Sequence, residues 1–363
     1  MRGDTDMATS IEDTVTPGPT GGSVGRGGEQ SRARYPDSEG YVQRDGQRLF
    51  YEVYGEGEAT IFLTQPWLVH SRHWKMQIHY LARHFRVLSM DGLGYGRSQR
   101  CREPRRYGAA ESARDCLAVM DASATERAVI IGYSRSAQYT LEMARLAPER
   151  IVSSVFIAPF FPYTPSHWSV LTHPLAQSLS RAFRLPKTVH RWWGHMYPAH
   201  WREDYPEFVD WFISRCLPEP HSTKGIEDGV GWALEIDPET LTATAYGHVH
   251  RNRSTLRGLA QNLDCPVLVI SGDRDKITPP RDARALARLS DGKLEVVCGA
   301  GHMLHVRKPV QVNLALREFV DRSLRRDPTV HSSGDGRPRA LFVSAPIGLG
   351  HVQRDVAVAR ELC

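Results

Sequence analysis

A serine at position 134 stands where its hydroxyl could act as a nucleophile. Residues 132–136 read G-Y-S-R-S and follow an apolar run, 128–131, that favours a buried strand. On a sharp turn from a strand into a helix, the serine hydroxyl points out of the sheet edge, and small residues two positions before and after it let strand and helix approach. The second small residue is Ser136, where the usual pattern has glycine. Read in isolation, the motif is also compatible with Ser134 as a helix N-cap.

Two later stretches supply the base and the orienting acid that a serine nucleophile requires. Asp273 and Asp275 come just past one apolar run, and His302 comes just past the next. Parallel strands place their carboxyl ends at one edge of a sheet, so we expect these groups to meet Ser134 there. The chain order of serine, acid and histidine is the one found in this architecture. His305 is the weaker candidate for the base.

The elements that must position these residues alternate between strand and helix patterns. Asp45-Gly46 between two β-rich runs predicts a hairpin turn. Short apolar runs separated by helices favour an α/β fold, with a mostly parallel β-sheet and helices on both faces. The expected strands are 60–64, 86–90, 128–132, 151–158, 266–271 and 294–297, and the expected helices are 74–85, 110–120, 135–146, 281–289 and 310–324.

Residues 162–256 interrupt this alternation and carry six of the eight tryptophans. The segment is expected to be mostly helical and to form a cap over a pocket at the carboxyl edge of the strands. Alternatively the tryptophans fill a small helical core, and we expect some of them to serve each purpose. The pair His248 and His250 favours a structural role over metal binding, because no cysteine or acidic cluster completes a ligand set. We expect no metal and no cofactor.

Residues 40–325 resemble the α/β-hydrolase superfamily. The family pattern G-x-x-D-x-x-x-P matches residues 272–279 and selects Asp275 over Asp273 as the triad acid. The family pattern G-H-x(6)-P matches residues 301–309, and the glycine-containing loop D-x-x-G-x-G-x-S matches residues 91–98. The α/β-hydrolase fold and a triad of nucleophile, base and acid are therefore what the resemblance implies.

The resemblance also implies an oxyanion hole built from backbone N–H groups. One donor follows the nucleophile and is Arg135. The other lies in a loop where the family usually has His-Gly and a bulky residue, and where this chain has Gln65-Pro66-Trp67. Pro66 has no N–H, but the donor position is the next residue, Trp67. The residues expected to contact substrate are His70, Tyr133 and Trp168.

Arg135 invites two interpretations, because a cation at a helix N-terminus opposes the helix dipole. Its guanidinium could face the pocket and favour substrates that bear a carboxylate or a phosphate. Alternatively it extends to solvent or pairs with a nearby acid.

Composition narrows the functional classes. The chain has 363 residues, of which 41% are hydrophobic and 24% charged, close to the globular average. It contains no apolar run long enough for a membrane span, no secretory h-region and no C-x-x-C pair, so we expect a cytoplasmic protein that binds no membrane. A net charge of +5 and a basic cluster without interleaved aromatic residues argue against nucleic-acid binding. The oligomeric state stays open.

The domain organisation follows from shifts in composition. Residues 1–38 are rich in Gly, Ser, Thr and Pro and predict a disordered tail. The hydrolase domain is expected at 39–325 and a linker at 326–338. Residues 339–363 resemble the opening strand, glycine loop and helix of GT-B type glycosyltransferases. So short a segment lacks the donor-binding domain and is expected to be a truncated piece that cannot transfer sugar.

These observations predict a serine hydrolase acting on an ester, thioester or related acyl substrate, with an apolar or aromatic group. Dehalogenases and epoxide hydrolases of this fold carry an aspartate at the nucleophile position, whereas this chain has Ser134. Carbon–carbon bond hydrolases and cofactor-free perhydrolases share the triad and stay open. The alternative is a low-turnover or non-catalytic binding module from a glycosyltransferase fusion. It is suggested by the departures Ser136, Pro66 and Arg307, the last of which stands two residues before Pro309, where the family often has an acid.

Overall fold

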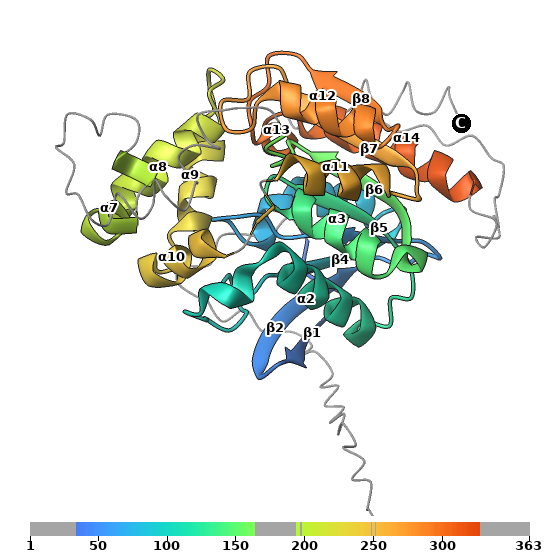
Figure 1. Ribbon diagram of the computed structural model, residues 1–363, viewed down its shortest axis with the longest axis horizontal. Coiled ribbons are helices and arrows are strands. Elements are labelled where there is room, and N and C mark those ends of the chain that lie inside the picture. Colours follow the sequence, from blue (N-terminus) through green and yellow to red (C-terminus); the bar gives the residue numbers. More distant parts are fainter. Residues whose placement is uncertain (1–33, 164–193, 197, 248, 251, 327–363) are drawn as a thin grey trace, which may run out of the picture.

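The computed structural model describes residues 34–163, 194–196, 198–247, 249–250 and 252–326. In this part of the chain, eight strands form one sheet in the order β1-β2-β4-β3-β5-β6-β7-β8 (Figure 1). β2 is antiparallel to β1 and to β4, and all other neighbouring pairs are parallel. The strands are β1 (Ser38–Arg44), β2 (Gln47–Tyr54), β3 (Thr60–Leu63), β4 (Arg86–Asp91), β5 (Ala128–Tyr133), β6 (Ile151–Ile157), β7 (Val267–Gly272) and β8 (Lys293–Val297).

Helices cover both faces of the sheet, as predicted. The helices that pack on it are α1 (Lys75–Leu81), α2 (Ala109–Ala122), α3 (Ser136–Leu146), α11 (Arg253–Gln261), α12 (Pro280–Leu289) and α14 (Pro309–Arg326), with the single turn α13 (Leu304–Arg307) between β8 and α14. α1 and α14 bury their apolar side chains on one face, and α2, α3, α11 and α12 bury theirs on the other.

The central strand β5 shows why a doubly covered sheet forms. All six of its residues are buried, and successive side chains alternate between the two faces. Val129 and Ile131 belong to the core beneath α1 and α14, whereas Ile130 packs with α2. A strand buried on both faces reads as a continuous apolar run, and that is the pattern of residues 128–131.

The predicted elements correspond to observed ones with small shifts at their ends. The hairpin turn at Asp45 and Gly46 has φ values of 49° and 74°, the left-handed pair of a tight two-residue connection. The helix predicted at 74–85 instead begins as a 3₁₀ turn, η1 (Ser71–Trp74), and its α-helical part ends at Leu81. Shorter-range bonds take over there, because the N–H groups of Arg83 and His84 donate to carbonyls three residues earlier.

The described chain begins inside the segment predicted as a disordered tail. The Arg34 guanidinium donates to the carbonyl of Ala82 at 3.3 Å and pairs with Asp37 at 2.7 Å. Asp37 also accepts a hydrogen bond from the N–H of Gly55. Residues 34–37 are therefore tied to the sheet, and the predicted boundary at 38 lies inside the packed chain. Residues 1–33, the linker beyond 326 and the glycosyltransferase-like segment 339–363 lie outside the described residues.

Short helices inserted between β6 and β7 stand where the cap was predicted. They are η4 (Gly194–Met196), α7 (Pro198–Glu203), α8 (Tyr205–Cys216), α9 (Thr223–Ala233) and α10 (Pro238–Tyr246). Figure 1 shows them to one side of the sheet. Trp201, Trp211 and Trp232 are buried and belong to the same apolar cluster as the sheet core beneath α1 and α14, so they do not form a separate helical core. Trp168, Trp192 and Trp193 lie outside the described residues. The predicted cap end at 256 falls within α11, which packs on the sheet layer beside α3 and α12.

Among the described residues, no helix combines the length and the apolar character needed to cross a membrane.

Candidate active site

Ser134 occupies a strained turn between β5 and α3. Its φ is +53°, in the left-handed region that non-glycine residues rarely adopt. The turn is crowded: a Cβ at Gly132 would come within 2.6 Å of the Thr140 hydroxyl and 3.0 Å of the Ser136 carbonyl. Ser136 replaces the usual glycine without loss of pairing, because its hydroxyl donates to the Tyr133 carbonyl and accepts from the Tyr133 N–H, both at 2.9 Å. The substitution therefore preserves the turn.

Three side chains from separate loops meet at the carboxyl edge of the sheet. The Nε2 atom of His302 lies 2.9 Å from the Ser134 hydroxyl, and its Nδ1 atom lies 2.8 Å from an oxygen of Asp275. Ser134 and His302 are 168 positions apart in the sequence, so only the tertiary fold brings them into contact. The side chains of His302 and Asp275 are 2% and 0% exposed. The arrangement links a hydroxyl, an imidazole and a carboxylate in series.

Asp275 is a buried carboxylate whose hydrogen bonds are satisfied within its own loop. One oxygen accepts from the N–H groups of Ile277 and Thr278 at 2.7 and 2.9 Å, and the other accepts from the Thr278 hydroxyl at 2.8 Å. Such bonds fix the orientation of the carboxylate. Asp273 instead accepts from the Gly299 N–H at 2.7 Å and holds the loop that precedes His302. Of the two acids, Asp275 is the one that contacts the imidazole.

A second histidine pair lies directly beneath the triad and was not predicted. His305 Nε2 and His73 Nδ1 lie 2.9 Å apart, and both rings pack against Tyr133. Burial, together with the nearby His302, lowers the pKa of His305 to about 3. Burial also holds the pKa of His73 well below its usual value. His305 is thus a buried neutral group bonded to His73, and His302 is the imidazole that reaches the serine.

The loop after β3 brings Trp67 to the same edge. The Gln65 side chain pins this loop by donating to the carbonyls of Pro66 and, at 2.9 Å, Val69. Leu68 adopts a φ of +77°, which makes the turn sharp. In the described part of the chain, the backbone N–H groups of Trp67 and Arg135 donate to no other protein group. The loop therefore keeps an available donor despite the proline.

The loop at residues 91–98 serves as a structural support for the site. Asp91 accepts from the N–H groups of Ser71 and Arg97, which holds the loop close to η1. A Cβ at Gly96 would meet the Asp91 carboxylate at 2.1 Å, and one at Gly92 would meet the Gln65 side chain at the same distance. The glycines are required for this close approach, as the sequence pattern indicates.

The cap is tied directly to the loop that carries His302. The Glu219 carboxylate accepts from the Gly301 N–H at 2.6 Å, and the Cys216 carbonyl accepts from the Met303 N–H at 3.0 Å. A Cβ at Gly301 would collide with the Pro218 ring at 2.3 Å. The end of α8 thus holds both neighbours of His302. No local sequence signal marks Glu219 for this function, because the contact joins residues 82 positions apart.

The guanidinium of Arg135 lies beside a small pocket of mixed polar and apolar lining. It is partly buried, and one of its amino groups donates to the Tyr107 carbonyl at 3.2 Å. Its Nε atom is buried without a hydrogen-bond partner among the described residues. In the same part of the chain, no carboxylate lies within ion-pair distance of it. The lining of this pocket includes Gln65, Leu93, Tyr107 and Thr244, and also the carboxylate of Asp115.

The residues predicted to contact substrate have differing surroundings. His70 is 3% exposed and lies 3.3 Å from a Glu235 oxygen. Tyr133 is equally buried and packs against the His302 ring at 5.1 Å, which supports that imidazole from below. Trp168 lies outside the described residues. Contact of these three with a substrate stays a prediction.

The sheet order, the strained serine turn and the ordered series of hydroxyl, imidazole and carboxylate together define an α/β hydrolase by fold and site. The family comparison agrees: the model of the alpha/beta hydrolase family matches residues 67–315. The chain belongs to this family.

Curated relatives and solved structures extend the match along most of the chain. A pimeloyl-[acyl-carrier protein] methyl ester esterase of Sodalis glossinidius is 26% identical over 278 residues, which cover 75% of this chain and 97% of that protein. A putative non-heme chloroperoxidase of Synechocystis is 24% identical, covering 75% of this chain and 94% of that protein. A thermophilic esterase structure from Thermogutta terrifontis superimposes with a TM-score of 0.64 at 24% identity, covering 79% of this chain and 99% of that one.

Proposed function

We propose that this protein is a serine hydrolase that cleaves an ester, a thioester or a related acyl bond, with Ser134, His302 and Asp275 as its catalytic triad. The observation that supports the proposal most directly is the pair of hydrogen bonds made by one imidazole, 2.9 Å to the serine hydroxyl and 2.8 Å to the carboxylate. The first can carry a proton away from the nucleophile, and the second fixes the tautomer that accepts it.

Acylation would follow from this geometry. The Ser134 oxygen attacks the substrate carbonyl carbon while its proton moves to His302 Nε2, and Asp275 stabilises the resulting imidazolium. The carbonyl electron pair moves onto oxygen, where the N–H groups of Trp67 and Arg135 would donate to the new oxyanion. The tetrahedral intermediate collapses as His302 returns the proton to the leaving alcohol or thiol. The acyl group is then an ester of Ser134.

Deacylation uses the same groups in reverse. His302 takes a proton from a water molecule, whose oxygen attacks the acyl carbon. The bond to Ser134 breaks, and the proton held by His302 returns to the serine oxygen. The products are a carboxylic acid and the free enzyme, so one water is consumed for each acyl bond cleaved.

The proposed substrate is a small-molecule ester with an apolar or aromatic group. Trp67, which would border the oxyanion, makes ring contacts with Trp201, Phe208 and Phe212 of the cap, so the cap side of the site is aromatic. Two relatives are named as a pimeloyl-[acyl-carrier protein] methyl ester esterase and as a putative carbamate hydrolase, and both names refer to cleavage at a carbonyl group. His70, Tyr133 and Trp168 remain the proposed additional contacts with the acyl or alcohol portion.

A fluorophosphonate probe tests the proposal, because it labels only a serine activated by its base. We expect the wild-type protein to be labelled and the Ser134→Ala variant to be unlabelled. Ser254→Ala, at the exposed start of α11, is the control and should be labelled like the wild type. A folded but unlabelled wild type would favour the low-turnover binding module instead. Nitrophenyl esters of increasing acyl length then define the substrate preference.

A further inference from the structure

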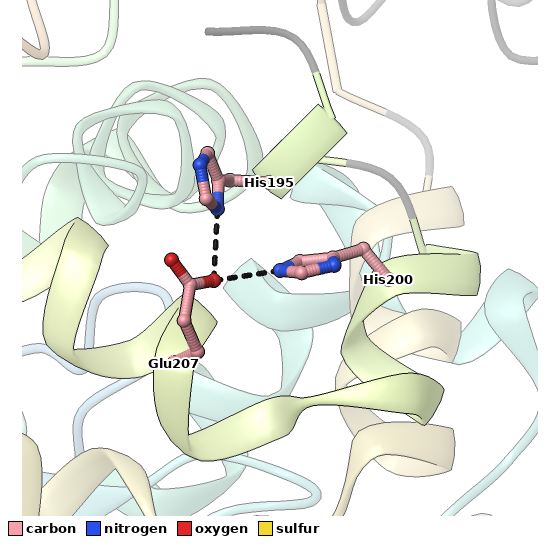
Figure 2. Close-up of side chains that lie close together, drawn as sticks. All are labelled: His195, His200 and Glu207. Atoms are coloured by element: carbon pink, nitrogen blue, oxygen red, sulfur yellow. Dashed lines mark hydrogen bonds and ion pairs between the residues drawn. The ribbon is translucent and has the colours of Figure 1, made fainter. Parts of the chain in front are cut away.

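Outside the triad, the cap contains a compact cluster of two histidines and a glutamate. We call His195, His200 and Glu207 the cap histidine cluster; they come from η4, α7 and α8 respectively. Figure 2 shows both imidazoles directed at the same carboxylate oxygen. His195 Nδ1 lies 2.9 Å and His200 Nε2 lies 2.7 Å from Oε2 of Glu207. One ligand atom from each residue lies within 4.8 Å of the other two.

The geometry points to a divalent transition-metal site in this cluster, and we propose that it binds Zn²⁺. Two imidazoles and one carboxylate form a ligand set that zinc uses in proteins, with a fourth position left for water. Among the first-row metals, zinc is one of those that neutral imidazole ligands suit, and carboxylate oxygen also binds zinc.

The separations of the ligand atoms fit such a site after a small adjustment. Bonds of about 2.0–2.1 Å in a tetrahedral arrangement place ligand atoms roughly 3.3 Å apart. The two nitrogen-to-oxygen distances in the cluster, 2.9 and 2.7 Å, are about half an ångström shorter. On metal binding, the proton of each neutral imidazole would move to the ring nitrogen that faces away from Glu207, and the metal would push the three ligand atoms apart. Because the three side chains are 20%, 27% and 43% exposed, they have room to move and the ion can enter from solvent.

The surroundings hold the ligands in place without blocking the site. The His195 ring stacks on Trp211 with a centroid distance of 4.6 Å and an interplanar angle of 20°. The indole N–H of Trp201 donates to the His195 carbonyl at 2.7 Å, which anchors the short η4 turn. Asp204 begins α8 by accepting from the Glu207 N–H at 3.2 Å. The Asp204 N–H also donates to the His200 carbonyl at 2.8 Å. Each ligand is thus held through its ring or its backbone, while its metal-binding atom faces the shared point.

Metal binding here would also bear on the active site through packing. Trp201 follows His200 on α7, and Phe208 follows Glu207 on α8. Both of these rings contact Trp67, at 5.8 and 6.3 Å between centroids. An ion that joins α7 to α8 would fix the two rings against the loop that carries the proposed oxyanion donor. The zinc site is therefore expected to act on the cap, and through it on KM, rather than on the triad chemistry.

Zinc binding to the untagged full chain tests this directly. After EDTA treatment and dialysis, we expect calorimetric titration with ZnCl₂ to show one site in the wild-type protein. His200→Ala and Glu207→Gln should each weaken that site by at least about tenfold, since each removes one of three protein ligands. The exposed His221 lies outside the cluster, so His221→Ala should bind like the wild type.

Two readouts make the result independent of hydrolysis. Co²⁺ in place of Zn²⁺ should give visible ligand-field bands in the wild type and the His221→Ala variant that are lost in the two ligand variants. Saturating Zn²⁺ should raise the Tm of the wild type by roughly 3 °C or more, with no rise in the His200→Ala variant. Equal zinc affinity in all four proteins, or no zinc bound to the wild type at 100-fold molar excess, would overturn the proposal. Neither readout depends on whether Ser134 is catalytic.

Discussion

Two regions of the molecule join histidine to carboxylate by hydrogen bonds, and they do so under different constraints. At the triad edge, His302 and Asp275 are almost fully buried, and Asp275 accepts three further hydrogen bonds from its own loop. In the cap histidine cluster, Glu207 is 43% exposed and accepts from two imidazoles on short elements. The first geometry is fixed by strand ends and suits proton transfer. The second can open by a fraction of an ångström and suits an ion.

We expect the largest effect on kcat from a substitution that disrupts the buried hydrogen bonds of His302 and Asp275 while leaving the shape of the side chain almost unchanged. Asp275→Asn should lower kcat by about 10³- to 10⁴-fold, because an amide favours the wrong imidazole tautomer. Asp273→Asn, two residues away, should lower kcat less than tenfold, since the Asp273 carboxylate contacts the Gly299 N–H and no catalytic group among the described residues. Steady-state kinetics on a nitrophenyl ester checks both. Similar kcat values for the two variants would contradict the assignment of the acid.

Burial beneath the triad edge should make the fold sensitive to acid. The folded-state pKa of His305 is lowered to about 3, whereas an unfolded histidine titrates near 6.5. Between these values the unfolded chain binds the extra proton, so the free energy of unfolding falls as pH decreases. The contribution of His305 is complete above about pH 6.5 and is lost at about 1.4 kcal/mol per pH unit below it.

The control for this prediction is a variant without that group. In urea unfolding followed by tryptophan fluorescence from pH 7 to pH 5, His305→Gln should show a shallower dependence on pH than the wild type. The other titrating groups are common to both proteins and cancel in the difference. Parallel curves for the two proteins would mean that His305 is protonated in the fold.

Local patterns were sufficient to predict the elements and the triad edge. The Asp45-Gly46 pair at a tight turn, the apolar run 128–131 and the spacing of residues 272–279 each depend on neighbours in sequence, and each has an observed counterpart. A departure such as Ser136 was harder to judge, because its compensation is a pair of hydrogen bonds to Tyr133 that appears only in three dimensions.

Contacts between distant residues could not be predicted in the same way. His73 and His305 are 232 positions apart, and Glu219 reaches Gly301 across 82 positions. The cap histidine cluster spans only residues 195–207, yet its spacing matches no metal motif, because the ligands lie on three short elements whose directions the sequence does not reveal. In each case the contact depends on how helices, strands and loops pack against one another. Hydrophobic periodicity predicts the elements themselves but not how they pack.

Arg135 follows Ser134 at the triad edge, and its substitution is expected to have an effect of intermediate size. Its partly buried guanidinium borders a small pocket and donates to the Tyr107 carbonyl. If that charge receives a substrate carboxylate or phosphate, Arg135→Leu should lower kcat/KM about tenfold more for anionic esters than for neutral ones of the same length. Paired esters that differ only in a terminal carboxylate measure this ratio. Equal losses on both would leave Arg135 with its backbone N–H as its only contribution.

The smallest effect is expected where the hydrogen bond between the Trp67 loop and α10 is removed. The Trp67 indole N–H donates to the Thr244 hydroxyl at 2.9 Å, and that hydroxyl also donates to the Leu241 carbonyl. Thr244→Val leaves the indole N–H unpaired at a cost of about 1 kcal/mol, so KM should rise up to about fivefold while kcat changes little.

A matched variant separates this junction from a general effect on α10. The Thr242 hydroxyl likewise donates to a carbonyl of its own helix, that of Pro238, but it makes no bond to Trp67. Thr242→Val therefore removes the same kind of helix contact and should leave KM unchanged. If both variants raised KM equally, the stiffness of α10 would govern substrate binding. The hydrogen bond between Trp67 and Thr244 would then have no specific effect on KM. A rise confined to Thr244→Val would instead show that the cap acts on the triad edge through the oxyanion loop.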